Sequence, residues 1–129
     1  MLQKNWFFKY TGGFSISKNS KSVIETLNYS AELLSDKNNM VLMFPQGEIV
    51  SMHKANFEFE KGVEKILQRT KNEVQVLFVA NIIDYLSEIK PSVYTYMSDY
   101  TGKYTISEIE KAYNSFYQKS LETQQMKKD

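Results

Sequence analysis

Apolar and polar positions follow two different periods along this chain, and the two periods predict different elements. Apolar residues recur at helical spacing over 21–35 and 57–70, and again after the Thr105–Glu108 capping box. Continuous apolar runs at 40–44 and 74–83 are typical of strands that are buried on both faces of a sheet. The pattern therefore predicts a chain in which helices and buried strands alternate.

The order of these elements predicts an α/β fold. Phe14–Ser17 and Val93–Met97 alternate between apolar and polar residues, as short strands do. A strand, a helix and a second strand over 14–44 make a βαβ-like unit, which favours a sheet of mostly parallel strands flanked by helices. We expect residues 1–123 to form one domain and residues 124–129 to be a frayed tail. The C-terminal helix is expected to turn an apolar stripe toward the core, comprising Ile106, Ile109, Tyr113, Phe116, Tyr117 and Leu121.

Composition narrows the classes of function. The chain has 129 residues, of which 42% are hydrophobic and 24% charged, as is typical of one soluble globular domain. A net charge of +1 gives no reason to expect binding to nucleic acid. There is no Cys and only one His, so the sequence predicts no metal site. No apolar stretch approaches the ~20 residues that span a bilayer, and we expect a cytoplasmic protein, with peripheral contact to the inner face of the membrane left open.

A tight turn follows the apolar run at Met40–Phe44. Pro45 cannot donate to a sheet ladder, so strand pairing is expected to stop there. Gly47 allows a sharp turn, and the polar residues Gln46 and Glu48 flank it. In open α/β sheets ligands bind beyond the ends of buried strands, which makes this turn a candidate site. An ordinary strand exit is the alternative interpretation.

Four stretches resemble motifs of the glycerolipid acyltransferases, which include glycerol-3-phosphate and 1-acylglycerol-3-phosphate acyltransferases. Phe44–Glu48 resembles the Phe-Pro-Glu-Gly-Thr motif, and Gly12–Lys18 resembles the glycine-rich second motif. Phe59–Gly62 is similar to the segment that follows the third motif, and Val74–Ile83 is similar to the fourth. The resemblance covers roughly residues 6–100 and implies the family's mostly parallel sheet, with its N-terminal part missing.

The resemblance also implies roles for individual residues. It assigns substrate binding to Lys18, Pro45, Gln46, Gly47, Glu48 and Lys61. Lys18 stands where the family has a phosphate-contacting arginine, and a lysine lacks the bidentate fork of that side chain. Ile49 replaces the arginine of the third motif, which weakens the implied phosphate binding in this loop. A solvated surface lysine is the alternative for Lys18 and for Lys61.

The family's catalytic motif is the part that this chain lacks. In the family, a histidine takes the proton of a glycerol hydroxyl, and the hydroxyl oxygen attacks an acyl thioester. An aspartate that follows the histidine after four intervening residues orients the histidine side chain. No such pair precedes Gly12. His53 is followed by Glu58 at the same spacing, but it comes after the third motif and is therefore only a weak candidate for the base. The alternatives for His53 are a polar loop residue and a contact to a substrate phosphate.

The resemblance implies an N-terminally shortened acyltransferase domain of glycerophospholipid biosynthesis. Its donor would be acyl-CoA or acylated acyl carrier protein, its acceptor glycerol phosphate or a lysophosphatidate-type lysophospholipid, and it would hold no bound cofactor. The chain as it stands is expected to be inactive, because the catalytic pair is absent. Two alternatives stay open: a non-catalytic acyl- or phospholipid-binding module, and a small α/β interaction domain. An exposed apolar face would also favour self-association.

Overall fold

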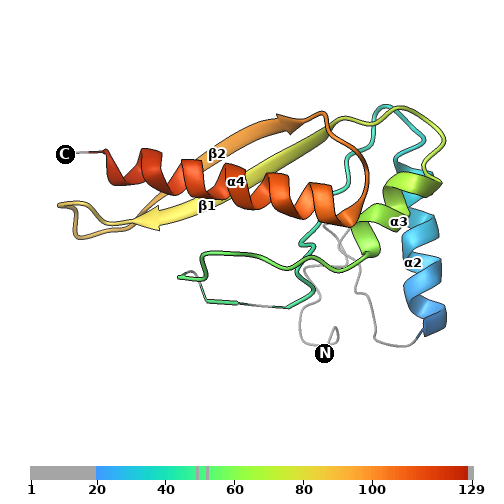
Figure 1. The fold of residues 1–129 in the computed structure, drawn as a ribbon, viewed down its shortest axis with the longest axis horizontal. Coiled ribbons are helices and arrows are strands. Elements are labelled where there is room, and N and C mark those ends of the chain that lie inside the picture. The colour runs from blue at the N-terminus through green and yellow to red at the C-terminus, as the bar shows by residue number, and fades with distance from the viewer. Residues whose placement is uncertain (1–19, 49, 52, 128–129) are drawn as a thin grey trace.

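The computed structural model describes residues 20–48, 50–51 and 53–127, and their fold is α+β (Figure 1). The described elements are α2 (Ser20–Leu33), α3 (Gly62–Arg69), β1 (Val76–Asp84), β2 (Ser92–Tyr100) and α4 (Ile106–Gln125). The two strands form one antiparallel sheet, so the predicted sheet of mostly parallel strands is wrong for the part of the chain that the structure describes.

The hairpin of β1 and β2 explains why the strands are antiparallel. Val76 lies opposite Tyr100, and Asp84 lies opposite Ser92 at the other end of the ladder. Only residues 85–91 connect the two strands. A parallel pair would need a crossover of about a dozen residues or more, so this connection permits only a hairpin. The strands predicted at 74–83 and 93–97 are present, and the second extends further in both directions.

The apolar run Met40–Phe44 does not form the buried strand that the sequence predicts. Met40, Leu42 and Phe44 are 88%, 72% and 79% exposed. Met43 alone packs against a core cluster, the one between α2 and α3. A central strand is buried by neighbours on both of its edges, and the described residues supply no such neighbour here. The predicted strand at 14–17 lies outside the described residues.

The helix α4 covers one face of the hairpin and carries most of the core. Ile109 and Tyr117 are buried against Phe78 and Ala80 of β1, so the predicted apolar stripe is confirmed from Ile109 to Leu121, while Ile106 belongs to none of the core clusters of the described residues. The helix continues through Gln124, where the sequence predicted a frayed tail. The Gln124 side chain is buried, accepts a hydrogen bond from the Tyr96 hydroxyl at 2.8 Å and donates one to Asp84 at 3.0 Å.

Polar side chains of α4 also hold the segment 55–59, which bends at 55–56, is extended from Phe57 and runs beside the helix (Figure 1). Asn114 accepts from the amide of Phe57 at 2.7 Å and donates to the carbonyl of Phe57 at 2.9 Å. One helical turn away on either side, Glu110 accepts from the Phe59 amide and Gln118 donates to the Ala55 carbonyl. The sequence predicts a helix from Phe57, but these bonds keep the segment extended and α3 begins at Gly62.

Candidate functional site

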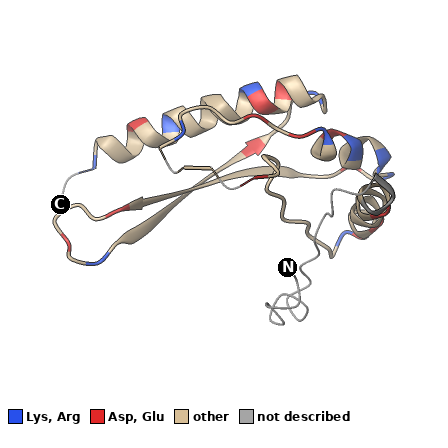
Figure 2. Cartoon of the chain, turned by 90° about the horizontal axis from the view of Figure 1, so that it is seen from below, with Lys and Arg blue, Asp and Glu red and all other residues tan. Residues whose placement is uncertain are grey.

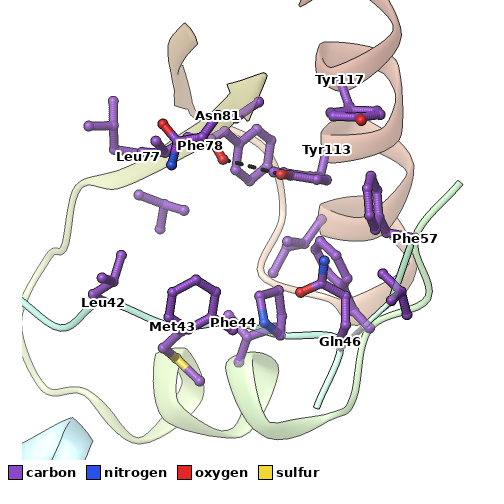
Figure 3. A pocket seen from close by; sticks show the side chains of 18 of the residues that line it. Leu42, Met43, Phe44, Gln46, Phe57, Leu77, Phe78, Asn81, Tyr113 and Tyr117 are labelled. Carbon is purple, nitrogen blue, oxygen red and sulfur yellow. Dashed lines mark hydrogen bonds between the residues drawn. The ribbon is translucent and has the colours of Figure 1, made fainter. Parts of the chain in front are cut away.

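An open groove of about 940 Å³ lies between β1 and the segment 41–53 (Figure 3). Its lining is mostly apolar and aromatic, and all residues from Val74 to Ile83 contribute to it. Because that run includes residues of both faces of β1, the groove follows the strand edge that β2 leaves free. Figure 3 labels the side chains that face one another across it, namely Leu42, Met43, Phe44 and Gln46 opposite Leu77, Phe78 and Asn81.

Tyr113 of α4 closes the base of the groove. Its ring centroid lies 5.4 Å from that of Phe78, 5.8 Å from that of Phe57 and 5.3 Å from that of Phe59. Its hydroxyl donates to the Val79 carbonyl at 3.1 Å, drawn as a dashed line in Figure 3. Burial raises the pKa of the Tyr113 hydroxyl, so the proton of this bond is retained at neutral pH. One aromatic ring therefore joins β1 to the extended segment.

The turn at Phe44–Gly47 is present, as the sequence predicts. The amide of Gly47 donates to the carbonyl of Phe44 at 3.3 Å, and Gly47 has φ +67°, which favours glycine. The next contact fixes the turn in place, because the amide of Glu60 donates to the Pro45 carbonyl at 2.8 Å. Gln46 is therefore held at the groove, where its side chain is half-buried (Figure 3).

The structure brings together part of the predicted site. Pro45, Gln46, Glu48 and His53 line the groove. Gly47 shapes the turn without being one of the lining residues. The remaining two predicted residues lie elsewhere: Lys61 is exposed at the start of α3, away from the groove lining, and Lys18 lies outside the described residues.

His53 and Glu58 do not point into the groove together. His53 is exposed at the lining of the groove, and its backbone amide donates to the Ser51 hydroxyl at 3.2 Å. Phe57 and Phe59 both line the groove, and successive side chains of an extended segment point to opposite sides. Glu58, which lies between them and is exposed, therefore points away. His53 and Glu58 therefore do not form a general base with its orienting carboxylate, despite their spacing in the sequence.

Sequence reasoning missed Asn81, a polar residue of the groove. Asn81 interrupts the apolar run of β1, and Thr95 of β2 donates its hydroxyl hydrogen to the Asn81 Oδ1 at 2.8 Å. The signal was available, because Asn81 is the one polar side chain between Val76 and Ile83. The ladder of Glu110, Asn114 and Gln118 was also missed, although these residues recur every four positions along α4.

Charged side chains are spread unevenly over the described residues. They lie on the helices, in the loops and near the strand ends, while the middle of the hairpin carries none (Figure 2). Asp84 is such a strand-end residue, and the hydrogen bond from Gln124, followed by that from the Leu86 amide, lowers the pKa of its carboxyl. No group of three or more His, Asp or Glu within the described ranges is placed to hold a metal ion.

Comparisons of the chain with protein-family models, with curated proteins and with solved structures find no match. Within residues 20–48, 50–51 and 53–127, none of the helices combines the length and the apolar character that crossing a bilayer requires.

Proposed function

We propose that the groove binds the acyl chain of an acylated ligand, and that this chain is the acyl-binding part of a glycerolipid acyltransferase. The observation that carries the proposal is a groove of about 940 Å³ with an apolar and aromatic lining, in which Gln46, Glu48 and His53 supply polar groups. Small-molecule sites combine these features, a mostly apolar cavity of roughly 300–1,000 Å³ with a few polar groups that orient the ligand.

The motif resemblance supports the second half of the proposal. Phe44–Glu48 and Val74–Ile83 resemble two acyltransferase motifs, and their residues lie on opposite walls of this one groove. An acyl thioester of coenzyme A or acyl carrier protein is the proposed donor, and glycerol phosphate or a lysophospholipid the proposed acceptor. His53 lacks an orienting carboxylate from Glu58, so we expect the purified chain to bind acyl thioesters without transferring the acyl group to lysophosphatidate.

The test uses two valines of the hairpin. Val79 lines the groove, whereas Val93 of β2 is exposed and does not. Titration calorimetry with dodecanoyl-CoA should show that Val79→Glu weakens binding at least tenfold, because a carboxylate in an apolar groove must be desolvated by the ligand. Val93→Glu should bind like the unaltered chain. Saturable binding that both variants weaken equally, or no binding by the unaltered chain, would refute the proposal; circular dichroism checks that both variants fold.

A second candidate function is an interaction domain that associates with a second copy of itself. Among the described residues β1 pairs only with β2, and its free edge carries no Lys or Pro that would discourage another strand. Leu77, Ile83 and Met97 are exposed on the open face beside that edge. Sedimentation velocity over a range of protein concentrations tests this candidate, and a monomer at every concentration would exclude it.

We propose that the protein works in the cytoplasm, at the inner face of the membrane. The tip of the hairpin supports this location, because Tyr85, Leu86 and Ile89 are exposed there, beside the exposed charges of Glu88 and Lys90. Exposed apolar side chains next to a lysine suit the boundary between lipid headgroups and acyl chains. Co-sedimentation with vesicles that contain anionic lipid should fall when Ile89 is replaced by Asp, and equal co-sedimentation would count against the membrane contact.

A further inference from the structure

The groove offers several polar groups to a ligand, but none of the described residues that line it is a Lys or an Arg. Glu48 is the one carboxylate among these residues. A carboxylate or phosphate drawn into an apolar site needs a cationic or multiply donating partner. The groove is therefore chemically matched to an acylated ligand whose linkage is uncharged.

Asn81 is placed to recognise such a linkage. Its Oδ1 accepts from the Thr95 hydroxyl at 2.8 Å on the β2 side, and Figure 3 shows the Asn81 side chain on the β1 wall, across from Gln46. A carboxamide has two N–H donors and an oxygen acceptor. Both side chains are exposed, and because Thr95 engages the oxygen, this bond orients the amide with its N–H donors available to a ligand.

Provided that the groove binds acyl chains, as proposed above, we propose that Asn81 donates a hydrogen bond to the carbonyl oxygen of an uncharged acyl linkage. Esters, thioesters and amides fit this description, since each presents a carbonyl oxygen next to an apolar chain. A free fatty acid is disfavoured, because its carboxylate meets Glu48 and no Lys or Arg in the lining. The groove thus distinguishes an activated or esterified acyl group from the free acid, and Thr95 acts as a positioning residue for Asn81.

Three ligands of one chain length test this inference by titration calorimetry with the full chain. They are the dodecanoyl thioester of N-acetylcysteamine, the dodecyl thioether of the same thiol, which keeps the acetamide but lacks the thioester carbonyl, and dodecanoate at pH 8. We expect the thioester to bind about three- to tenfold more tightly than the thioether, the range that one hydrogen bond supports. Dodecanoate should bind more weakly than the thioester.

The variants assign that preference to one side chain. Asn81→Leu keeps the volume and removes the donors, and Asn81→Asp keeps the shape and leaves only acceptors. Both should bind thioester and thioether equally, and Thr95→Val should show a reduced preference. Asn28→Leu is the matched control, because Asn28 is exposed on α2 away from the groove lining and should keep the full preference.

The outcomes separate this inference from the proposed function. Carbonyl recognition by Asn81 is supported if Asn81→Leu and Asn81→Asp abolish the preference for the thioester and Asn28→Leu retains it. A preference that survives in both Asn81 variants overturns it, and so does equal binding of thioester and thioether by the unaltered chain; in these two cases acyl binding itself stands. Failure of all three ligands to bind overturns the proposed function as well.

Discussion

The two walls of the groove are built from similar residues but are held very differently. On one wall, Phe78 and Ala80 of β1 are buried under α4, and β2 pairs along the whole strand. On the other wall, Met40–Phe44 is as apolar as β1, yet its alternate side chains are exposed and only Met43 is anchored. The walls differ in their neighbours and not in their hydrophobicity.

This difference shows that the burial of a segment depends on the elements that come next in the chain. β1 is followed by a hairpin partner and then by an amphipathic helix, so its neighbours come from the next 41 residues, Tyr85–Gln125. Met40–Phe44 is followed instead by a turn and by the segment 55–59, which bonds to α4. A continuous apolar run predicts a buried strand only where the chain also supplies elements that cover it, as β2 and α4 cover β1.

The same substitution in each wall should produce the largest contrast in stability. Phe78→Ala removes a ring that is 8% exposed and should cost about 3–5 kcal/mol of unfolding free energy. Phe44→Ala removes a ring that is 79% exposed and should change stability by less than about 0.5 kcal/mol. Urea denaturation followed by circular dichroism measures both. Equal losses would mean that the second wall is packed as tightly as the first.

Removing the middle residue of the α4 ladder should have an intermediate effect. Asn114→Ala deletes two hydrogen bonds to Phe57 and leaves its backbone groups without their partners, at a cost of about 1–3 kcal/mol. Hydrogen exchange of the Phe57 amide should accelerate accordingly. Ser115→Ala, on the exposed side of the same helix, is the control and should change neither quantity. Unaltered exchange in Asn114→Ala would show that the segment is held by its aromatic contacts alone.

Two glycines should respond to alanine in opposite directions. Gly47→Ala forces a side chain into φ +67° and places a Cβ 3.1 Å from the Glu60 Cγ, which should cost about 1–2 kcal/mol and loosen the turn. Gly62→Ala places its Cβ 3.6 Å from Leu27, an ordinary contact at the start of α3, and should leave stability unchanged or slightly higher. Thermal unfolding distinguishes the two variants, and equal melting temperatures would contradict a structural role for the turn.

The smallest expected effect concerns acid stability at the end of the β1 wall. The hydrogen bond from Gln124 lowers the Asp84 pKa below its ordinary value of 3.8. The stability that this carboxylate contributes is therefore fully present above that value and is lost as the pH falls through the lowered pKa. Asp84→Asn should make the decline of the urea midpoint below about pH 4 shallower. Gln124→Met, which removes the donor, should give the same shallower decline, and an unchanged slope in both would contradict this role.

The sequence predicted the elements that depend on local pattern and missed those that depend on a partner. The stripe from Ile109 to Leu121 placed α4 correctly, and the β-branched and aromatic run at 93–97 placed β2. The predicted direction of strand pairing was wrong, because the connection at 85–91 is too short for the crossover that parallel strands need. The helix predicted from Phe57 failed because the side chain of Asn114, 57 residues away, binds the backbone of Phe57.

The candidate site was predictable only where a turn or a motif marked it. Pro45 and Gly47 identified the turn, and with it Gln46 and Glu48, because proline and glycine constrain the backbone by themselves. The side chain of Asn81 is oriented by Thr95, its partner across the hairpin, and neither residue alone reveals the pairing register. Lys61 lies away from the groove lining, because a charge near a motif in the sequence has no fixed direction in space.

The polar ladder of Glu110, Asn114 and Gln118 on α4 sets the register of the segment beside it. Four helical residues rise about 6.0 Å, whereas two extended residues advance about 6.6–6.8 Å. The two repeats are nearly equal, so the side chains of Glu110, Asn114 and Gln118 all reach the backbone of the segment, at 2.8, 2.7 and 2.6 Å. Only one register pairs Asn114 with Phe57, and a slip of the segment by one residue would turn both Phe57 and Phe59 out of the groove. The helix α4 therefore sets the position of the back of the groove, independently of the turn at Pro45–Gly47 in front of it.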